Sequence, residues 1–159
     1  MSSKKKTFFS RLEKGLKIIL GAEVSIGDVI YCIEESNILQ KDLDNLSKIE
    51  KRLARSVRTC YDNVTLKHKV DEALNLKVSL DINNDVGVIC HLAQDLTYNK
   101  LLLLVGKLTY LTKEVYKDKV ILLIIGDKIM QKSPIVKDLR RLSESIDVNF
   151  YFLETKKNE

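Results

Sequence analysis

The chain has 159 residues, of which 45% are hydrophobic and 31% are charged, and its formal net charge is +5 at pH 7. This length and apolar content suffice for one domain with a buried core, and they exclude a disordered or fibrous protein. The longest apolar runs, LLLLVG and VILLIIG, are too short to span a bilayer, so we expect no membrane contact. The excess of positive charge mildly favours an acidic partner such as nucleic acid.

The cysteines and histidines give no sign of a metal site. Cys32, Cys60 and Cys90 are widely spaced without a CxxC pair, and the chain contains only two histidines. This pattern is typical of buried structural thiols in an intracellular protein. We therefore expect a cytoplasmic protein with three structural thiols and no cofactor.

The first part of the chain, residues 7–45, is expected to form an extension to the core. Residues 7–20 suit a helix, because apolar and charged residues alternate at helical spacing, which favours a surface helix over a signal peptide. The apolar positions are Phe8, Leu12, Leu16 and Ile19. Residues 21–40 fit either a strand or a short helix pair.

The helical period is clearer from residue 41 to residue 60. The apolar positions of this segment form one stripe, made of Leu46, Ile49, Leu53 and Val57. Either Asp42 or Asp44 is expected to cap the helix. Residues 64–74 are expected to continue as a second helical piece.

The period changes to two in the segment KVSLDI, which is typical of a strand. This alternation places Val78, Leu80 and Ile82 on one face of the strand. Asn83 and Asn84 tolerate positive φ and therefore indicate a hairpin turn, after which DVGVICHL forms the return strand.

The remaining elements are predicted as a helix over residues 98–116, a strand in KVILLIIGD, a helix in SPIVKDLRRLSESI and a last strand in VNFYFLE. The continuously apolar strand is typical of burial on both faces of a sheet. Together the elements predict an α/β domain with a central mixed sheet flanked by helices. No linker divides the chain, so we expect one domain over residues 1–159, with a core at 46–153 and a frayed tail at 154–159.

This order of elements, with the residues it carries, resembles the restriction-endonuclease-like core of the PD-(D/E)xK nuclease superfamily over residues 46–153. In that family a helix carries a glutamate, the first hairpin strand carries an aspartate, and the second strand carries Glu-x-Lys. The carboxylates hold one or two Mg²⁺ ions, which activate water against a phosphodiester. The resemblance implies Glu50 for the helix glutamate, in IEKRLARSVRTCY, and Asp81 for the aspartate, in SLDI.

The second hairpin strand departs from the family pattern. In GVICHL, Ile89 takes the glutamate position and His91 takes the lysine position. Isoleucine cannot ligate Mg²⁺, which requires oxygen ligands. The resemblance therefore implies a nuclease-like scaffold that has lost its metal site. An active enzyme would need Asp81 or Asp85 as metal ligands, and Lys107 from the following helix in place of the missing lysine.

The length of the hairpin loop decides whether a remnant of the site exists. A two-residue loop made of the asparagines alone turns Asp81 away from Ile89 and His91. A three-residue loop that includes Asp85 pairs Asp81 with Gly87 and brings Asp81, Ile89 and His91 onto one face. The nuclease-like interpretation requires the second register.

One face of the helix around residues 48–58 is strongly basic. Its cations recur at spacings of three and four residues and are Lys48, Lys51, Arg52, Arg55 and Arg58. Such a face can neutralise several phosphates and so bind nucleic acid without reading its sequence. The alternative is an ordinary solvated helix surface.

Three functions fit these patterns. We favour a nucleic-acid-binding protein on a nuclease-like scaffold, without enzyme activity. The first alternative is a Mg²⁺-dependent nuclease with relocated catalytic residues, drawn from Glu50, Asp81, His91 and Lys107. The second alternative is a non-enzymatic interaction or assembly module, in which Ile89 turns the former active face into an apolar contact surface for a homodimer or another protein partner.

Overall fold

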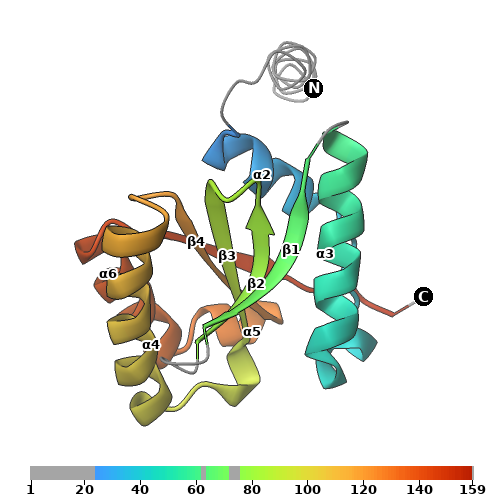
Figure 1. The fold of residues 1–159 in the computed structure, drawn as a ribbon. Coiled ribbons are helices and arrows are strands. Elements are labelled where there is room, and N and C mark those ends of the chain that lie inside the picture. Colours follow the sequence, from blue (N-terminus) through green and yellow to red (C-terminus); the bar gives the residue numbers. More distant parts are fainter. Residues whose placement is uncertain (1–23, 62–63, 72–75, 159) are drawn as a thin grey trace.

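Five strands form one mixed sheet with the spatial order β1-β2-β3-β4-β5 (Figure 1). The computed structural model describes residues 24–61, 64–71 and 76–158. Its strands are Leu66–Asp71 (β1), Leu76–Ile82 (β2), Val86–Leu92 (β3), Val120–Gly126 (β4) and Asn149–Glu154 (β5). Strands β1, β2 and β3 are antiparallel neighbours, whereas β3, β4 and β5 run parallel. The predicted α/β architecture with a central mixed sheet is confirmed.

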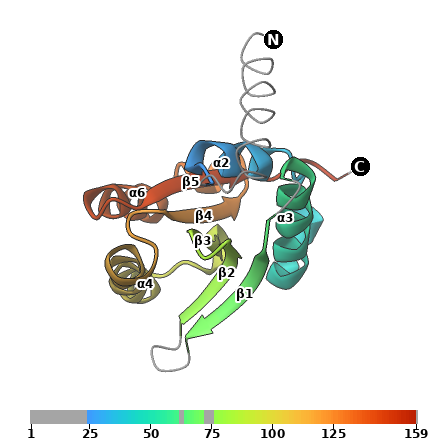
Figure 2. The ribbon, with the colours of Figure 1, turned by 45° about the horizontal axis from the view of Figure 1, so that its top comes forward.

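Helices cover both faces of this sheet (Figure 2). On one face lie α2 (Ile26–Glu34) and α3 (Leu46–Cys60), and on the other lie α4 (Tyr98–Tyr110) and α6 (Pro134–Ser145). The short pieces are η1 (Gln40–Asp44), η2 (Ala93–Asp95), the π-helical η3 (Leu111–Val115) and α5 (Lys128–Gln131). Each parallel crossover passes through a helix, since α4 joins β3 to β4 and α6 joins β4 to β5.

Strand β4 is buried on both faces of the sheet, as its continuous apolar run predicts. Ile121, Leu123 and Ile125 pack towards α2 and α3, while Leu122 and Ile124 pack towards α4 and α6. All five side chains are fully buried. Strand β4 therefore contributes to both hydrophobic cores of the protein, one on each face of the sheet.

Helix α3 buries its predicted stripe, with Ile49, Leu53 and Val57 at 0% exposure. Its cap differs from the prediction, because the side chain of Asn45 accepts the Lys48 N–H at 3.2 Å. Asp42 instead lies inside η1, where its carboxylate is fully buried. An amide and a carboxylate serve equally well as helix caps, so the sequence alone does not separate these positions.

The prediction of a helical piece over residues 64–74 is wrong. Residues 66–71 form β1, which pairs with β2 in antiparallel register. This segment is short and mostly polar, and lysines such as Lys67 are typical of an edge strand. Pairing with β2 supplies the backbone hydrogen bonds that the segment would otherwise lack.

The predicted alternation along β2 holds only in part. Leu80 and Ile82 pack towards α2 and α3, but Val78 packs on the opposite side with α4. The cause is an irregularity in the β1–β2 register between Lys67 and Lys69. A β-bulge of this kind shifts the following side chains to the other face of the sheet.

The cysteines also differ from the prediction. Cys32 in α2 and Cys60 in α3 form a disulfide bond, with their Cα atoms 6.2 Å apart. Cys90 is a buried free thiol, and burial raises its pKa to about 12. The expectation of three free thiols therefore holds for one residue and is wrong for two.

The predicted N-terminal helix at 7–20 lies outside the described residues. Of the ambiguous stretch 21–40, the described part contains helix α2. Residues 155–158, expected as part of a frayed tail, are hydrogen bonded to the loop before η1. Lys156 N–H donates to the Ile38 carbonyl at 2.9 Å, and Gln40 N–H donates to the Lys156 carbonyl at 3.0 Å.

Candidate functional site

The β2–β3 hairpin has the three-residue loop that the nuclease-like interpretation requires. Asp81 pairs with Gly87, and Ile82 pairs with Val86. Asn83 and Asn84 both have a φ of 56°, the left-handed conformation that asparagine tolerates. The hairpin therefore directs Asp81 and Gly87 towards the α4 side of the sheet.

Asp81 is fully buried, and both of its carboxylate oxygens accept hydrogen bonds. The Tyr116 hydroxyl donates to Oδ2 at 2.6 Å, and the Asn84 N–H donates to Oδ1 at 2.9 Å. Burial raises the pKa of Tyr116, and the hydrogen bond to Asp81 raises it further. These contacts give Asp81 a structural role in closing the hairpin loop.

Glu50 lies on the other side of the sheet, on α3. Glu50 is only 7% exposed, and its Oε1 accepts a hydrogen bond from Lys77 Nζ at 3.2 Å. No hydrogen bond from the described residues reaches the buried Oε2. Glu50 and Asp81 are therefore separated by the sheet and cannot share one metal ion.

His91 and Lys107 do come together, in a cavity of about 340 Å³ between β2, β3 and α4. Burial lowers the pKa of His91, and the charges of Lys100 and Lys107 lower it further, against the opposing effect of Asp95. His91 follows Gly87 by four residues, which places it roughly 13 Å farther along the strand than Asp81. The pair is thus remote from the predicted metal ligand.

Two further predicted positions are occupied by structural contacts. Ile89 is 3% exposed and packs in the core beside α4, so it offers no apolar contact surface. Asp85 forms an ion pair with Lys119 at 3.0 Å. Among residues 24–61, 64–71 and 76–158, no group of three or more His, Cys, Asp or Glu side chains is placed to hold a metal ion.

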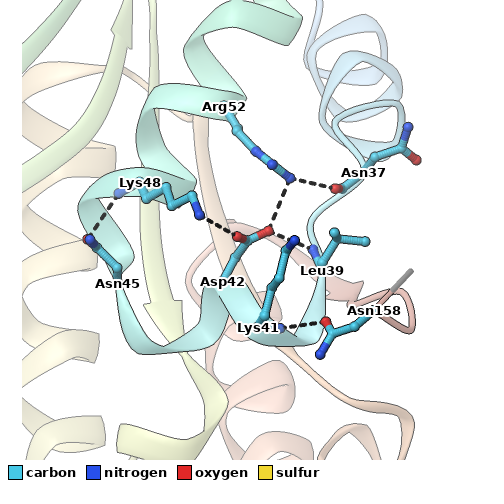
Figure 3. A network of polar contacts seen from close by, with 8 residues as sticks. All are labelled: Asn37, Leu39, Lys41, Asp42, Asn45, Lys48, Arg52 and Asn158. Atoms are coloured by element: carbon cyan, nitrogen blue, oxygen red, sulfur yellow. Dashed lines mark hydrogen bonds and ion pairs between the residues drawn. The ribbon is translucent and has the colours of Figure 1, made fainter.

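The five basic residues predicted on α3 separate into three groups. Lys48 and Arg52 turn towards the buried carboxylate of Asp42, at 3.2 Å and 3.1 Å (Figure 3). Arg55 points towards α2, where it lines a cavity together with Arg52. Lys51 and Arg58 line a third cavity, formed with β1 and β2.

This α3–β2 cavity has a volume of about 270 Å³ and is strongly basic. Its charged lining consists of Lys51, Arg58, Lys67 and Lys77, with Glu50 as the one carboxylate. Lys77 and Ser79 also line the α4 cavity that holds His91, so the two cavities adjoin at β2.

The two adjoining cavities together carry six cationic side chains and one carboxylate. The cations are Lys51, Arg58, Lys67, Lys77, Lys100 and Lys107. The predicted basic face did not include Lys67, Lys77 or Lys100. The alternation of KVSLDI could have indicated Lys77, because it puts a lysine on a strand that faces a basic helix.

No protein-family model matches this chain, and comparisons with curated proteins and with solved structures find no significant match. Within the described part of the chain, no helix is long and apolar enough to cross a membrane.

Proposed function

We propose that the protein binds nucleic acid on the basic surface formed by the α3–β2 cavity and the α4 cavity. The observation that carries the proposal is the ratio of six cations to one carboxylate around these two adjoining cavities. The carboxylate, Glu50, is already paired with Lys77. A concentration of cations around a concave surface attracts the phosphate backbone by releasing counterions, without reading base sequence.

The proposal includes a nuclease-like scaffold without a working metal site. The order α3, β2, β3, α4, β4 follows the sequence of elements that the resemblance implies and supports this part of the proposal, although β1 between α3 and β2 was not expected. The separation of Glu50 from Asp81, and the two hydrogen bonds to Asp81, favour a binding protein over a Mg²⁺-dependent nuclease. We infer no cofactor for this function. The expected cytoplasmic location stays a prediction, and the disulfide bond is more typical of an oxidising compartment.

The test is fluorescence anisotropy with labelled single-stranded and double-stranded DNA and RNA, titrated at several salt concentrations. The logarithm of the binding constant is expected to fall linearly with the logarithm of the salt concentration. The Lys51→Ala/Arg58→Ala variant should weaken binding to all sequences and make the slope shallower by about 2, one for each lost phosphate contact.

A matched control is available at a separate cavity outside the proposed surface. Lys132 and Lys137 are exposed and line a separate basic cavity beside α5 and α6. The Lys132→Ala/Lys137→Ala variant loses the same charge but should keep most of the affinity. Equal losses in both variants, or binding that salt does not weaken, would refute the proposed surface. Cleavage of the labelled strand with Mg²⁺ but not with EDTA would favour the nuclease instead.

A further inference from the structure

The α4 cavity opens where β2 separates from β3. Residues 80–82 of β2 pair with residues 86–88 of β3, and the β1–β2 ribbon then extends away from β3 (Figure 2). Beyond the paired segment the Cys90 N–H donates to the Ser79 hydroxyl at 3.1 Å, a side-chain bond where a continuous antiparallel ladder would have a backbone bond. The cavity of about 340 Å³ therefore lies against the opened edge of the sheet, with α4 as its other wall.

The two adjoining cavities differ in chemistry. Among the described residues that line the α4 cavity, five of the eleven are leucine or isoleucine. Five of the eleven described residues that line the α3–β2 cavity are charged, and two are leucine. The cavities share Lys77 and Ser79, and the neighbouring Leu46 and Ser47 at the start of α3 line one each. A ligand that occupies both cavities therefore needs an apolar part and an anionic part a short distance apart.

Cations surround the mouth of the apolar cavity. Lys77 and Lys100 are exposed, whereas Leu76 and Leu104 are only 3% and 4% exposed. The Lys100 Nζ donates to the Asp95 carbonyl at 3.2 Å, which holds its charge beside the cavity. A lysine in such a position keeps its charged group in water while its stem lies along apolar surface. The rim can therefore hold an anion whose apolar part enters the cavity.

His91 adds a neutral polar group to this cavity. Burial lowers its pKa, and the charges of Lys100 and Lys107 lower it further, against the opposing effect of Asp95. A neutral imidazole has one hydrogen-bond donor and one acceptor, which matches the mixture of donors and acceptors on the edge of a nucleobase. The cavity thus offers apolar surface for the face of a base and a polar group for its edge.

A double helix cannot use this apolar surface. Its bases are stacked and paired, so it presents mainly phosphates and polar groove edges to a protein. A single strand can turn one base out of its stack. Proteins that bind single strands combine a cationic groove for the phosphates with aromatic or apolar surface for the bases. When nucleic acid binds across both cavities, the leucines therefore contribute only if the strand is single.

We infer that the protein binds single-stranded nucleic acid, with one base in the α4 cavity and the adjacent phosphates on the cations of the α3–β2 cavity. This inference rests on the proposed function and names the class of its ligand. The cavity volume lies within the range of about 300–1,000 Å³ that is typical of small-molecule pockets, so a single base fits. The phosphates of the strand explain the cations, and its base explains the leucines beside them.

Fluorescence anisotropy with three labelled ligands of equal length tests the class of ligand. They are a thymidine oligonucleotide, a strand of abasic nucleotides that keeps every phosphate, and the duplex of thymidine with adenosine strands. The thymidine strand should bind about 5-fold tighter than the abasic strand at the same salt concentration, the low end of what one base contributes. It should also bind tighter than the duplex, whereas a purely electrostatic surface prefers the duplex for its higher charge density.

Leu103 and Leu102 provide a matched pair of variants. They are neighbours on α4 with relative exposures of 66% and 67%, and of the two only Leu103 is among the residues that line the α4 cavity. Leu103→Asn should weaken binding of the thymidine strand about 5-fold. It should leave the affinity for the abasic strand and the salt slope unchanged, because losing a base contact changes no phosphate contact. Leu102→Asn should leave all of these unchanged, and both exposed positions should tolerate the substitution.

Three outcomes would overturn the inference while leaving the proposed surface standing. They are equal affinities for the thymidine and abasic strands, tighter binding of the duplex, and equal losses in the two leucine variants. In each of these cases binding still weakens with salt and in Lys51→Ala/Arg58→Ala. Absence of salt-sensitive binding to all three ligands would instead refute the proposed function, and this inference with it.

Discussion

Tyr116 fixes the hairpin by two contacts from one side chain. Its hydroxyl donates to Asp81, and its ring lies where a Cβ atom on Gly87 would be, only 2.5 Å from the nearest ring atom. Asp81 and Gly87 are opposite each other in the β2–β3 register. A larger residue at position 87 would displace the ring, so glycine is required here for space and not for its backbone conformation.

The Tyr116→Phe variant tests the role of this hydrogen bond. The ring is kept, but the buried Asp81 carboxylate loses its hydroxyl donor, so we expect the free energy of unfolding to fall by about 1–3 kcal/mol. Urea titration measures this at neutral pH. Burial, then the bond to Asp81, raises the pKa of Tyr116 above its unfolded value. The stabilisation is therefore complete below pH about 10 and declines as the pH rises further.

The variant lacks this titration, so the difference in stability between wild type and Tyr116→Phe should shrink above pH about 10. Tyr151 provides a comparison, because its hydroxyl donates to Glu34 at 2.8 Å in a more exposed position. Tyr151→Phe should lower the free energy of unfolding at neutral pH by less than Tyr116→Phe does. Equal costs for the two variants would contradict a special role for the buried Asp81 contact.

At the scale of elements, the sequence predicts the helices and strands whose hydrophobic residues follow a strong and regular pattern. The stripe of α3 and the apolar run of β4 place these elements correctly, because burial on one helix face or on both sheet faces leaves a direct periodic signal. Strand β1 carries no such signal. Its conformation depends on pairing with β2, and a short polar segment does not encode the position of its partner.

The disulfide bond joins two elements that local pattern does not connect. Cys32 lies on α2 and Cys60 on the last turn of α3, and 28 residues separate them. Closing a loop of this length restricts the unfolded chain and stabilises the folded state by about 3.5 kcal/mol. We predict that Cys60→Ser lowers the free energy of unfolding by about this amount under non-reducing conditions.

The measurement is guanidinium denaturation of both proteins with and without a reductant. Wild type should lose stability when reduced and then approach the variant, which should not respond to the reductant. Cys90 remains a thiol in both proteins, so it does not affect the comparison. A wild-type protein that is insensitive to reductant, with two additional titratable thiols after unfolding, would show that the bond does not form.

At the scale of the whole molecule, the basic helix α3 shows that sequence pattern does not predict which distant residues a side chain contacts. The spacing of Lys48, Lys51 and Arg52 predicts neighbouring positions on one helix, and this is correct. The spacing does not predict that Lys48 and Arg52 form ion pairs with the buried Asp42. Nor does it predict that Lys51 and Lys77, from α3 and β2, line the same cavity. Side-chain partners that are far apart in the chain depend on the assembled fold. The sequence therefore indicated basic character but not the surface that carries it.

The Asp42 network ties three parts of the molecule together. The carboxylate accepts the Leu39 N–H at 3.0 Å and pairs with Lys48 and Arg52, while Arg52 also donates to the Asn37 carbonyl at 3.1 Å (Figure 3). Next to it, the neighbouring Lys41 N–H donates to Asn158 Oδ1 at 2.8 Å. The loop after α2, the start of α3 and the C-terminal residues thus converge on η1.

The Asp42→Asn variant should therefore lower the free energy of unfolding. Its side chain is fully buried, whereas Lys48 and Arg52 keep partial exposure of 51% and 32%, so we expect a loss of about 2 kcal/mol, below the range for a wholly buried pair. Burial alone would raise the pKa of Asp42, but the Leu39 N–H and the two cations outweigh it and lower the pKa. The stabilisation is then present above pH about 4 and disappears as the pH falls through the lowered value.

Urea titrations from neutral to acidic pH measure both effects. The curves of wild type and Asp42→Asn should differ at neutral pH and converge at low pH, because protonation of Asp42 removes the same charge as the substitution. Asp44→Asn is the matched control, since Asp44 belongs to the same short helix but is exposed. Two outcomes would show that the buried charge does not hold these three segments together. One is a difference in stability between wild type and Asp42→Asn that stays constant with pH, and the other is an equal loss of stability in Asp44→Asn.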